Sequence, residues 1–271
     1  MENKKKIGFI GSGKMAGAII KGLIKTGFAD ADYIKATQAE QEGVEEKSRE
    51  LGVKIILDNK ELVRNSDLIF IAVKPSQVLG VLEEVKEYIN ESKLVVSIAA
   101  GVTINKLETN LPQKTRVIRV MPNTPALVGE GMSGIAGGNF AKPEDLVYVK
   151  SLLSTIGKCI VVDNEAQMDV VTAISGSGPA FYYKVINEIA RAGEKLGMDY
   201  EKALLLSIQT AIGSAKMALM REIPMEQLIS NVATKGGCTA VGVDCMNENN
   251  TEKLFYDVIE STTKKAHALG Q

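Results

Sequence analysis

The sequence of 271 residues contains one histidine, no tryptophan and three cysteines. The histidine, His267, lies in a helical pattern near the end of the chain, and we interpret it as a surface residue. Its isolation argues against mechanisms that need a histidine–carboxylate pair or a histidine base. Cys159, Cys238 and Cys245 show neither CxxC spacing nor a histidine cluster. We therefore predict reduced thiols and no metal site.

An excess of charge and long hydrophobic runs are also absent. The 32 basic and 33 acidic residues leave a net charge of -1, which gives no electrostatic footprint for nucleic acid. No apolar run reaches the roughly eighteen residues of a membrane span, and no signal-like stretch follows the N-terminal lysines. We therefore expect a cytoplasmic protein with a small-molecule substrate, bound neither to nucleic acid nor to a membrane.

The most specific motif follows the first apolar strand. Residues 7–16 read Ile-Gly-Phe-Ile-Gly-Ser-Gly-Lys-Met-Ala, a strand that runs into a GxGxxA turn. Gly11 would permit the tight turn, Gly13 would let the backbone approach a pyrophosphate, and Ala16 would let the next helix pack closely. The N-terminus of that helix supplies an anion site. The motif predicts dinucleotide binding, and a structural turn without a ligand is the alternative.

Apolar strands alternate with helical patterns as far as residue 162, and only helical patterns follow Asp163. This predicts an α/β chain, with an N-terminal Rossmann-type doubly wound sheet followed by an all-helical C-terminal domain. We assign residues 1–163 to dinucleotide binding and 164–271 to dimerisation and substrate binding, because the helices have wide apolar faces that predict a homodimer. The candidate strands are 6–10, 33–37, 68–73, 94–98, 116–121, 133–137 and 159–162.

The end of the second strand usually selects the cofactor, because an acidic residue there binds the ribose hydroxyls and disfavours a 2′-phosphate. Thr37 and Gln38 occupy this position. The missing acid favours NADPH, although Glu40 and Glu42 follow closely and no arginine is present to bind a phosphate. NADH stays the alternative cofactor.

Two further loops follow strands, at the edge where ligands of such sheets bind. Lys74 and Pro75 end the third candidate strand, either as a ligand contact or as a simple strand stop. Asn123 lies between Pro122 and Pro125, which would fix its amide for a ligand or merely stiffen a connector.

Two glycine clusters interrupt the helical half. Residues 175–180 would let two backbones approach or would break one helix into two, and both readings are structural. The turn 234–240 reads Thr-Lys-Gly-Gly-Cys-Thr-Ala. A glycine pair that opens a helix presents free backbone N–H groups, which suit a substrate carboxylate, or it merely joins two helices.

Together and in this order, these motifs resemble those of pyrroline-5-carboxylate reductases over essentially the whole chain. The resemblance implies reduction of (S)-1-pyrroline-5-carboxylate to L-proline, the last step of proline biosynthesis, with hydride from NAD(P)H. It is carried by residues 8–16, 72–75, 121–125, 175–179 and 236–239. The implied cofactor contacts are Ile10, Gly11, Ser12, Gly13, Lys14, Met15, Thr37, Gln38, Asn59, Ala72, Val73, Lys74, Pro75, Ala99 and Ala100. The implied substrate contacts are Glu165, Asn231, Cys238, Thr239 and Ala240.

The resemblance also assigns roles. Thr239 would be the catalytic residue, donating to the substrate carboxylate or ring nitrogen, and Glu165 would orient the pocket. The family usually has Ser-Pro before the two glycines, where this chain has Thr234 and Lys235. Lys235 either adds charge for a carboxylate or leaves the loop looser. Assemblies as large as a decamer of five dimers are implied as well.

Two other functions are open to the sequence. A β-hydroxyacid dehydrogenase would use a helical lysine with a nearby asparagine, and Lys184 and Asn187 lie one turn apart, although a solvated helix face explains both. A redox sensor would bind the dinucleotide and turn over no imine.

Overall fold

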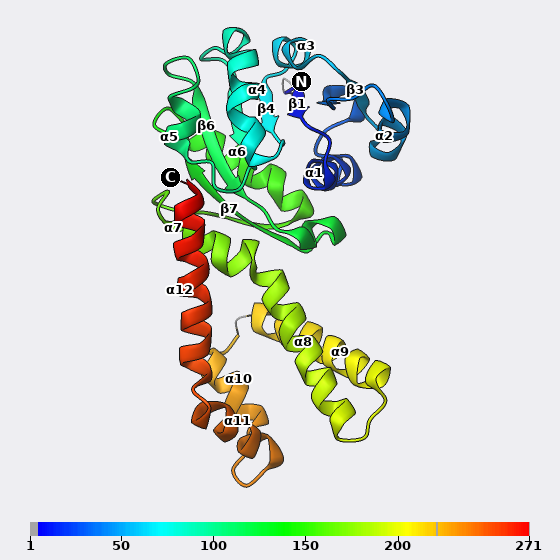
Figure 1. Cartoon of the computed structure of the whole chain (residues 1–271), viewed down its shortest axis with the longest axis vertical. Coiled ribbons are helices and arrows are strands. Elements are labelled where there is room, and N and C mark those ends of the chain that lie inside the picture. The colour runs from blue at the N-terminus through cyan, green and yellow to red at the C-terminus, as the bar shows by residue number, and fades with distance from the viewer. Residues whose placement is uncertain (1–4, 221, 271) are drawn as a thin grey trace. The chain divides into compact units, whose positions relative to one another are not determined.

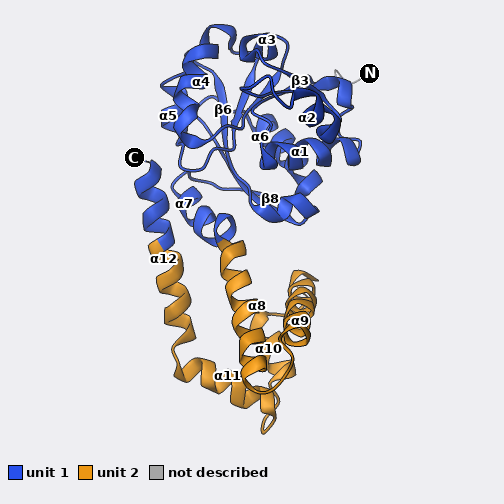
Figure 2. Cartoon of the chain, turned by 45° about the vertical axis from the view of Figure 1, so that its right-hand side comes forward, with its two compact units in different colours: residues 1–177, 262–271 blue, residues 178–261 orange. Residues whose placement is uncertain are grey.

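The computed structural model describes residues 5–220 and 222–270, which divide into two compact units (Figures 1 and 2). Unit 1 comprises Met1–Ser177 and Thr262–Gln271, and unit 2 comprises Gly178–Ser261. Residues 164–177 and the end of the last helix therefore group with the sheet. These units do not follow the ranges 1–163 and 164–271, which stay a prediction about functional regions.

Unit 1 is built on an eight-stranded sheet with the order β3-β2-β1-β4-β5-β6-β7-β8. Neighbouring strands are parallel except β6 and β7, which are antiparallel. The predicted doubly wound sheet is confirmed, with β3 as a strand that the sequence analysis missed. The strands are β1 Ile7–Ile10, β2 Ile34–Thr37, β3 Lys54–Ile56, β4 Leu68–Ile71, β5 Leu94–Ser97, β6 Arg116–Met121, β7 Gly131–Gly137 and β8 Gly157–Val161.

Helices cover both faces of the sheet, so the central strands are apolar on both sides. Phe9 and Phe70 stack on one face with ring centroids 4.5 Å apart, while Ile10 and Ile69 pack into the opposite layer. Helices α1 Lys14–Lys25, α2 Val44–Leu51 and α6 Pro143–Leu153 contribute to the first layer. The second layer includes side chains from α3 Asn59–Arg64, α4 Val78–Val85 and α5 Ile104–Glu108.

A π-helix, Thr172–Gly176, follows the short helix α7, Gln167–Val171. A Cβ on Gly176 would lie 2.4 Å from Met121 Cε, so this glycine permits a close approach to the end of β6. Both alternatives for the first glycine cluster were structural, and in the structure residues 172–176 separate α7 from the helix that begins at Gly178.

Unit 2 is helical, as predicted, and in it α8 packs against α9. Asp199 caps α9, because its Oδ1 accepts from Lys202 N at 3.1 Å. Thr251 is of a residue type that often caps a helix, but here it is the first residue of the last helix, and its hydroxyl donates to Met246 O at 2.7 Å. The helices are α8 Gly178–Lys195, α9 Tyr200–Met220, α10 Met225–Val232, α11 Cys238–Glu248 and α12 Thr251–Gly270, whose end belongs to unit 1.

The helices of unit 2 expose large apolar side chains in the single chain, among them Leu205 at 67% and Val241 at 69%. Among the described residues, α9 is the one helix long and apolar enough to cross a membrane by length and composition, with a mean hydropathy of 1.4. The core helix of a soluble protein can meet the same criteria of length and composition.

Candidate active site

The two glycines of the loop after β1, Gly11 and Gly13, differ in their surroundings. Gly11 has a φ of +101°, and a Cβ there would lie 2.6 Å from the carbonyl oxygen of Ala72. Gly13 precedes α1 with an ordinary φ of -68°, and a Cβ there would meet no atom within 4 Å. The fold therefore requires glycine at the first position but not at the second. The open space at Gly13, beside the unpaired amides of the first helical turn, fits a pyrophosphate.

A pocket of about 550 Å³ begins at this loop and continues beside α1. Its lining includes Ser12 and Gly13 from the loop, Lys14 from the start of α1, and Leu127 and Val128 from the segment after β6.

The end of β2 carries a chain of three hydrogen bonds. The Thr37 hydroxyl accepts from Gly11 N at 3.2 Å and donates to Asn59 Oδ1 at 2.7 Å. Asn59 Nδ2 in turn donates to Glu84 Oε2 on α4 at 2.9 Å. Thr37 is 2% exposed, so its hydroxyl is committed to this internal chain. Gln38 uses its amide differently, donating to the carbonyls of Glu40 and Glu42.

The remaining predicted cofactor residues follow β4 and β5. Ala72 N donates to Ile10 O at 2.9 Å, which joins the loop after β4 to that after β1. Pro75 starts a 3₁₀-helix, Pro75–Gln77, and Ala99 N donates to Ser97 Oγ at 3.3 Å. Since β2, β1, β4 and β5 are adjacent and parallel, their carboxyl ends lie at one edge of the sheet. The structure brings the predicted cofactor residues together at this edge.

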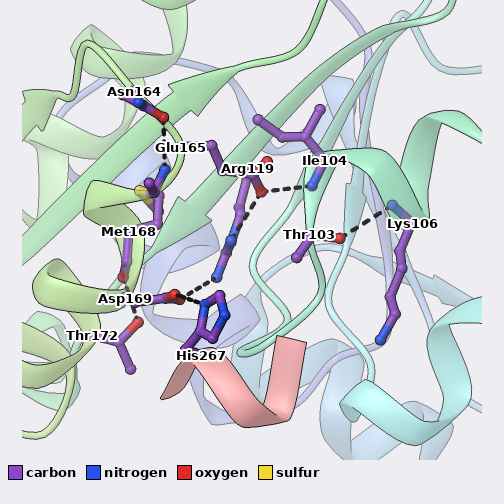
Figure 3. Close-up of polar contacts among 11 residues, drawn as sticks. Thr103, Ile104, Lys106, Arg119, Asn164, Glu165, Met168, Asp169, Thr172 and His267 are labelled. Carbon is purple, nitrogen blue, oxygen red and sulfur yellow. Dashed lines mark hydrogen bonds and ion pairs between the residues drawn. The ribbon is translucent and has the colours of Figure 1, made fainter. Parts of the chain in front are cut away.

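Glu165 lies in a cluster of charged side chains in unit 1 (Figure 3). Its Oε1 accepts from Ile104 N at 2.7 Å and from Arg119 Nη1 at 2.9 Å. The Arg119 side chain, 5% exposed, also has Nη2 3.8 Å from Asp169 Oδ1. His267 Nδ1 is 3.0 Å from Asp169 Oδ2, with its side chain 66% exposed. The predicted surface position of His267 is confirmed, but its contact with Asp169 was not foreseen.

Sequence reasoning missed Arg119, although a signal for it exists. Strand β6 reads Arg-Val-Ile-Arg-Val-Met, and a charged residue inside a buried strand needs a partner. Glu165 and Asp169 supply it. The arginine fixes the Glu165 carboxylate in position and balances its charge.

The other predicted substrate residues belong to unit 2. Asn231, on α10, is exposed, and its Oδ1 accepts from Gln227 Nε2 at 2.8 Å. Cys238, Thr239 and Ala240 form the first turn of α11. The structure therefore places these three together in one turn, while the full set of predicted substrate residues is divided between the two units.

The turn before α11 depends on its glycines. Gly236 has a φ of +79°, and Gly237 N donates to Thr234 O at 2.9 Å. Lys235 is exposed beside them. The amides of Cys238 and Thr239 come too early in the helix to bond a preceding helical carbonyl, so they can receive an anion.

Asn123 serves the fold, as the plainer alternative expected. Its Nδ2 donates to Ser175 O at 3.0 Å and its Oδ1 accepts from Met132 N at 2.8 Å. Lys184 likewise fits a solvated face, because it is 72% exposed and pairs with Glu188. Within residues 5–220 and 222–270, no group of three or more His, Cys, Asp and Glu side chains is arranged to hold a metal ion.

Comparison with known proteins agrees with this arrangement. Residues 165–269 match the family model described as pyrroline-5-carboxylate reductase dimerisation, and residues 6–101 match that of the coenzyme F420-dependent NADP oxidoreductases. The pyrroline-5-carboxylate reductase of Methanosarcina acetivorans is 40% identical over 271 residues, with 100% of each chain covered. That of Pasteurella multocida is 36% identical, with 98% of each chain covered.

Solved structures give the same result. A pyrroline-5-carboxylate reductase from Coxiella burnetii has a TM-score of 0.94 at 33% identity, covering 99% of this chain and 100% of that one. The Plasmodium falciparum enzyme, solved with NADP bound, has a TM-score of 0.86 at 33% identity, with 100% of each chain covered. The chain belongs to the pyrroline-5-carboxylate reductase family.

Proposed function

We propose that this protein reduces (S)-1-pyrroline-5-carboxylate to L-proline, the last step of proline biosynthesis, with NADPH as hydride donor and NADH as a second donor. The observation that carries the proposal is the glycine loop at the carboxyl edge of the sheet. Gly13 leaves room that the fold itself does not need, next to the N-terminus of a twelve-residue helix. Such an arrangement binds the pyrophosphate of a dinucleotide.

The residues at this edge fit a nicotinamide dinucleotide. The loop from Ile10 to Met15 would hold the pyrophosphate, and Thr37, Gln38 and Asn59 would lie toward the adenosine ribose. The segments 72–75 and 99–100 would contact the rest of the cofactor. When bound, the cofactor supplies the hydride, and the protein supplies binding and orientation.

The substrate is a cyclic imine with a carboxylate, and a protonated imine accepts hydride most readily. Glu165, Asn231 and the turn from Cys238 to Ala240 would bind it. The free amides at the start of α11 suit the carboxylate, and the Thr239 hydroxyl would donate to the carboxylate or the ring nitrogen. Glu165, held by Arg119 and Ile104 N, would orient the ring.

We also infer a homodimer through the helical region, assembled further into a decamer of five dimers in the cytoplasm. Support for the dimer comes from the match of residues 165–269 to the dimerisation model and from the exposed apolar side chains of unit 2. The decamer rests on the family resemblance alone. Light scattering measures both, and a monomeric mass at working concentration would exclude the dimer.

The first experiment follows NADPH oxidation by absorbance with pyrroline-5-carboxylate, repeats it with NADH, and identifies proline as product. Turnover supports the proposal. Binding of the dinucleotide without turnover of the imine would contradict it and favour a hydroxyacid dehydrogenase or a sensor.

Thr239→Ala tests the catalytic assignment. We expect a higher KM and a kcat/KM lower by about 10- to 100-fold, the effect of losing a hydrogen bond to a charged group. Thr239→Ser keeps the hydroxyl and should retain most activity. Wild-type kinetics in a folded Thr239→Ala protein would remove Thr239 from the site.

A further inference from the structure

We propose that Glu84 is a specificity residue of the dinucleotide site, where its carboxylate favours a 2′-hydroxyl over a 2′-phosphate. This inference rests on the proposed use of a nicotinamide dinucleotide and identifies what sets the preference between its two forms. In many sheets of this type an acidic residue at the end of β2 has that role. Here Thr37 and Gln38 stand at that point, and the acid comes from α4 instead.

The hydrogen-bond chain at the end of β2 has only one possible direction. An ionised carboxylate can only accept, so Asn59 must turn its NH₂ group toward Glu84. Its carbonyl oxygen then faces Thr37, whose hydroxyl must donate to it. That hydroxyl keeps a lone pair for the N–H of Gly11. Glu84 therefore orients polar groups from α4 to the glycine loop.

The hydrogen-bonding groups of Asn59 and Glu84 that this hydrogen-bond chain does not use are available to a ligand. Asn59 Nδ2 carries a second N–H, and the Glu84 carboxylate has further acceptor capacity. A ribose hydroxyl both donates and accepts, so it can use both groups. A phosphate dianion can use the amide N–H, but its charge is repelled by the carboxylate.

Within the described part of the protein, the negative charge of Glu84 is not balanced by an ion pair, in contrast to those of Glu83 on the same helix and of Glu50. Among the ion pairs formed within residues 5–220 and 222–270, Glu83 pairs with Lys86 and Glu50 with Lys21 and Lys47, but Glu84 pairs with no cation. Because Glu84 is exposed, water and salt weaken its field. The result is a bias against the phosphate and not its exclusion, which leaves both NADPH and NADH usable.

The test is Glu84→Gln, with Glu83→Gln as the matched control. The glutamine introduced at position 84 can still accept from Asn59 through its amide oxygen, so the substitution removes the charge and keeps the contact. Glu83→Gln makes the same change of charge one residue away on the same helix. Dissociation constants for NADP⁺ and NAD⁺ are measured by titration calorimetry, alongside kcat/KM for NADPH and NADH.

We expect Glu84→Gln to raise the preference for the phosphorylated cofactor by about three- to tenfold, and Glu83→Gln to leave it within about twofold of wild type. Added salt should raise this preference in the wild type and have less effect in Glu84→Gln. An unchanged preference in Glu84→Gln, or an equal shift in both variants, would overturn the inference. If the wild type binds dinucleotides but reduces no imine, the proposed reaction fails and the shift in affinity still supports the role of Glu84.

Discussion

Two alanine substitutions in one loop should have opposite consequences, because Gly11 and Gly13 are glycines for different reasons. Each substitution adds a single methyl group within the same GxGxxA turn. At Gly11 the added methyl conflicts with the fold, and at Gly13 it meets no atom of the protein, so it would conflict only with a ligand bound there. The prediction is that Gly11→Ala lowers stability, whereas Gly13→Ala lowers dinucleotide affinity without lowering stability.

The cost at Gly11 has two parts. Its φ of +101° lies where residues with a side chain are strained, at about 1–2 kcal/mol. The new Cβ would also lie 2.6 Å from Ala72 O and 3.2 Å from Val73 Cγ1, so the backbone after β4 must shift. Overpacking of this kind costs about 1–3 kcal/mol. We therefore expect the free energy of unfolding to fall by about 2–5 kcal/mol, a large share of the stability of an ordinary domain.

The change at Gly13 should be nearly neutral for folding. Its φ of -68° suits alanine, and a Cβ would meet nothing within 4 Å. Alanine lowers the conformational entropy of the unfolded chain, which stabilises the folded protein. This gain offsets the poorer helix capping by alanine to within about 1 kcal/mol. A methyl group in the space for the pyrophosphate should weaken dinucleotide binding by about 1–3 kcal/mol, or roughly 5- to 150-fold.

The assay compares urea unfolding of the three proteins without dinucleotide and the dissociation constant of NADP⁺ for each. Equal losses of stability in the two variants would refute the distinction between them. Wild-type affinity in Gly13→Ala would show that no phosphate approaches this loop.

Three further substitutions test the packing of unit 1. Lys93→Met should lower the free energy of unfolding by about 1–3 kcal/mol, measured by urea unfolding, because Lys93 Nζ donates to the buried carbonyls of Val63 at 2.8 Å and Ser66 at 2.6 Å. Arg119→Met should lower the free energy of unfolding by about 3–5 kcal/mol, because the carboxylates of Glu165 and Asp169 lose their cation. A thermal unfolding midpoint equal to that of the wild type would contradict this prediction. Burial raises the pKa of Cys159 from 9.0 to about 11, so its stabilising contribution is complete below pH 9.0 and is lost as the pH rises through about 11. The difference in unfolding free energy between wild type and Cys159→Ala should therefore shrink between pH 8 and pH 10, and a constant difference would contradict the shift.

Much of the sheet could be predicted because its strands are short apolar runs, and glycine or proline residues near their ends mark where several of them stop. Strand β3 was missed because it has only three residues, Lys54–Ile56, which is too short for a pattern. The antiparallel direction of β7 was also not predictable, since direction depends on pairing and not on local sequence. Thr251 is of a residue type that often caps a helix, but Asn250, with a φ of +54°, precedes the helix instead. The Thr251 hydroxyl donates to the carbonyl oxygen of Met246, five residues earlier in the chain.

The candidate site was predictable where its residues are neighbours in the chain. The glycine loop and the turn before α11 each form a local motif whose geometry depends on glycine. Glu84 and Arg119 were not predicted because each contacts a residue that is distant in the sequence. The Glu84 side chain contacts Asn59, which is 25 positions away, and the Arg119 side chain contacts Glu165, which is 46 positions away. The tertiary fold brings these pairs together, and no single segment encodes the pairing.

The division of the chain has a consequence for biosynthesis. Unit 1 is interrupted at Ser177 and resumes at Thr262, so its last segment emerges from the ribosome only after all of unit 2. That segment lies against Gly101, where an added Cβ would be 3.3 Å from Leu269 Cβ. It also places His267 in contact with Asp169. Unit 1, although its first residues are translated first, is therefore completed after unit 2. A nascent chain that ends before residue 262 lacks the segment that lies against Gly101, in the loop after β5.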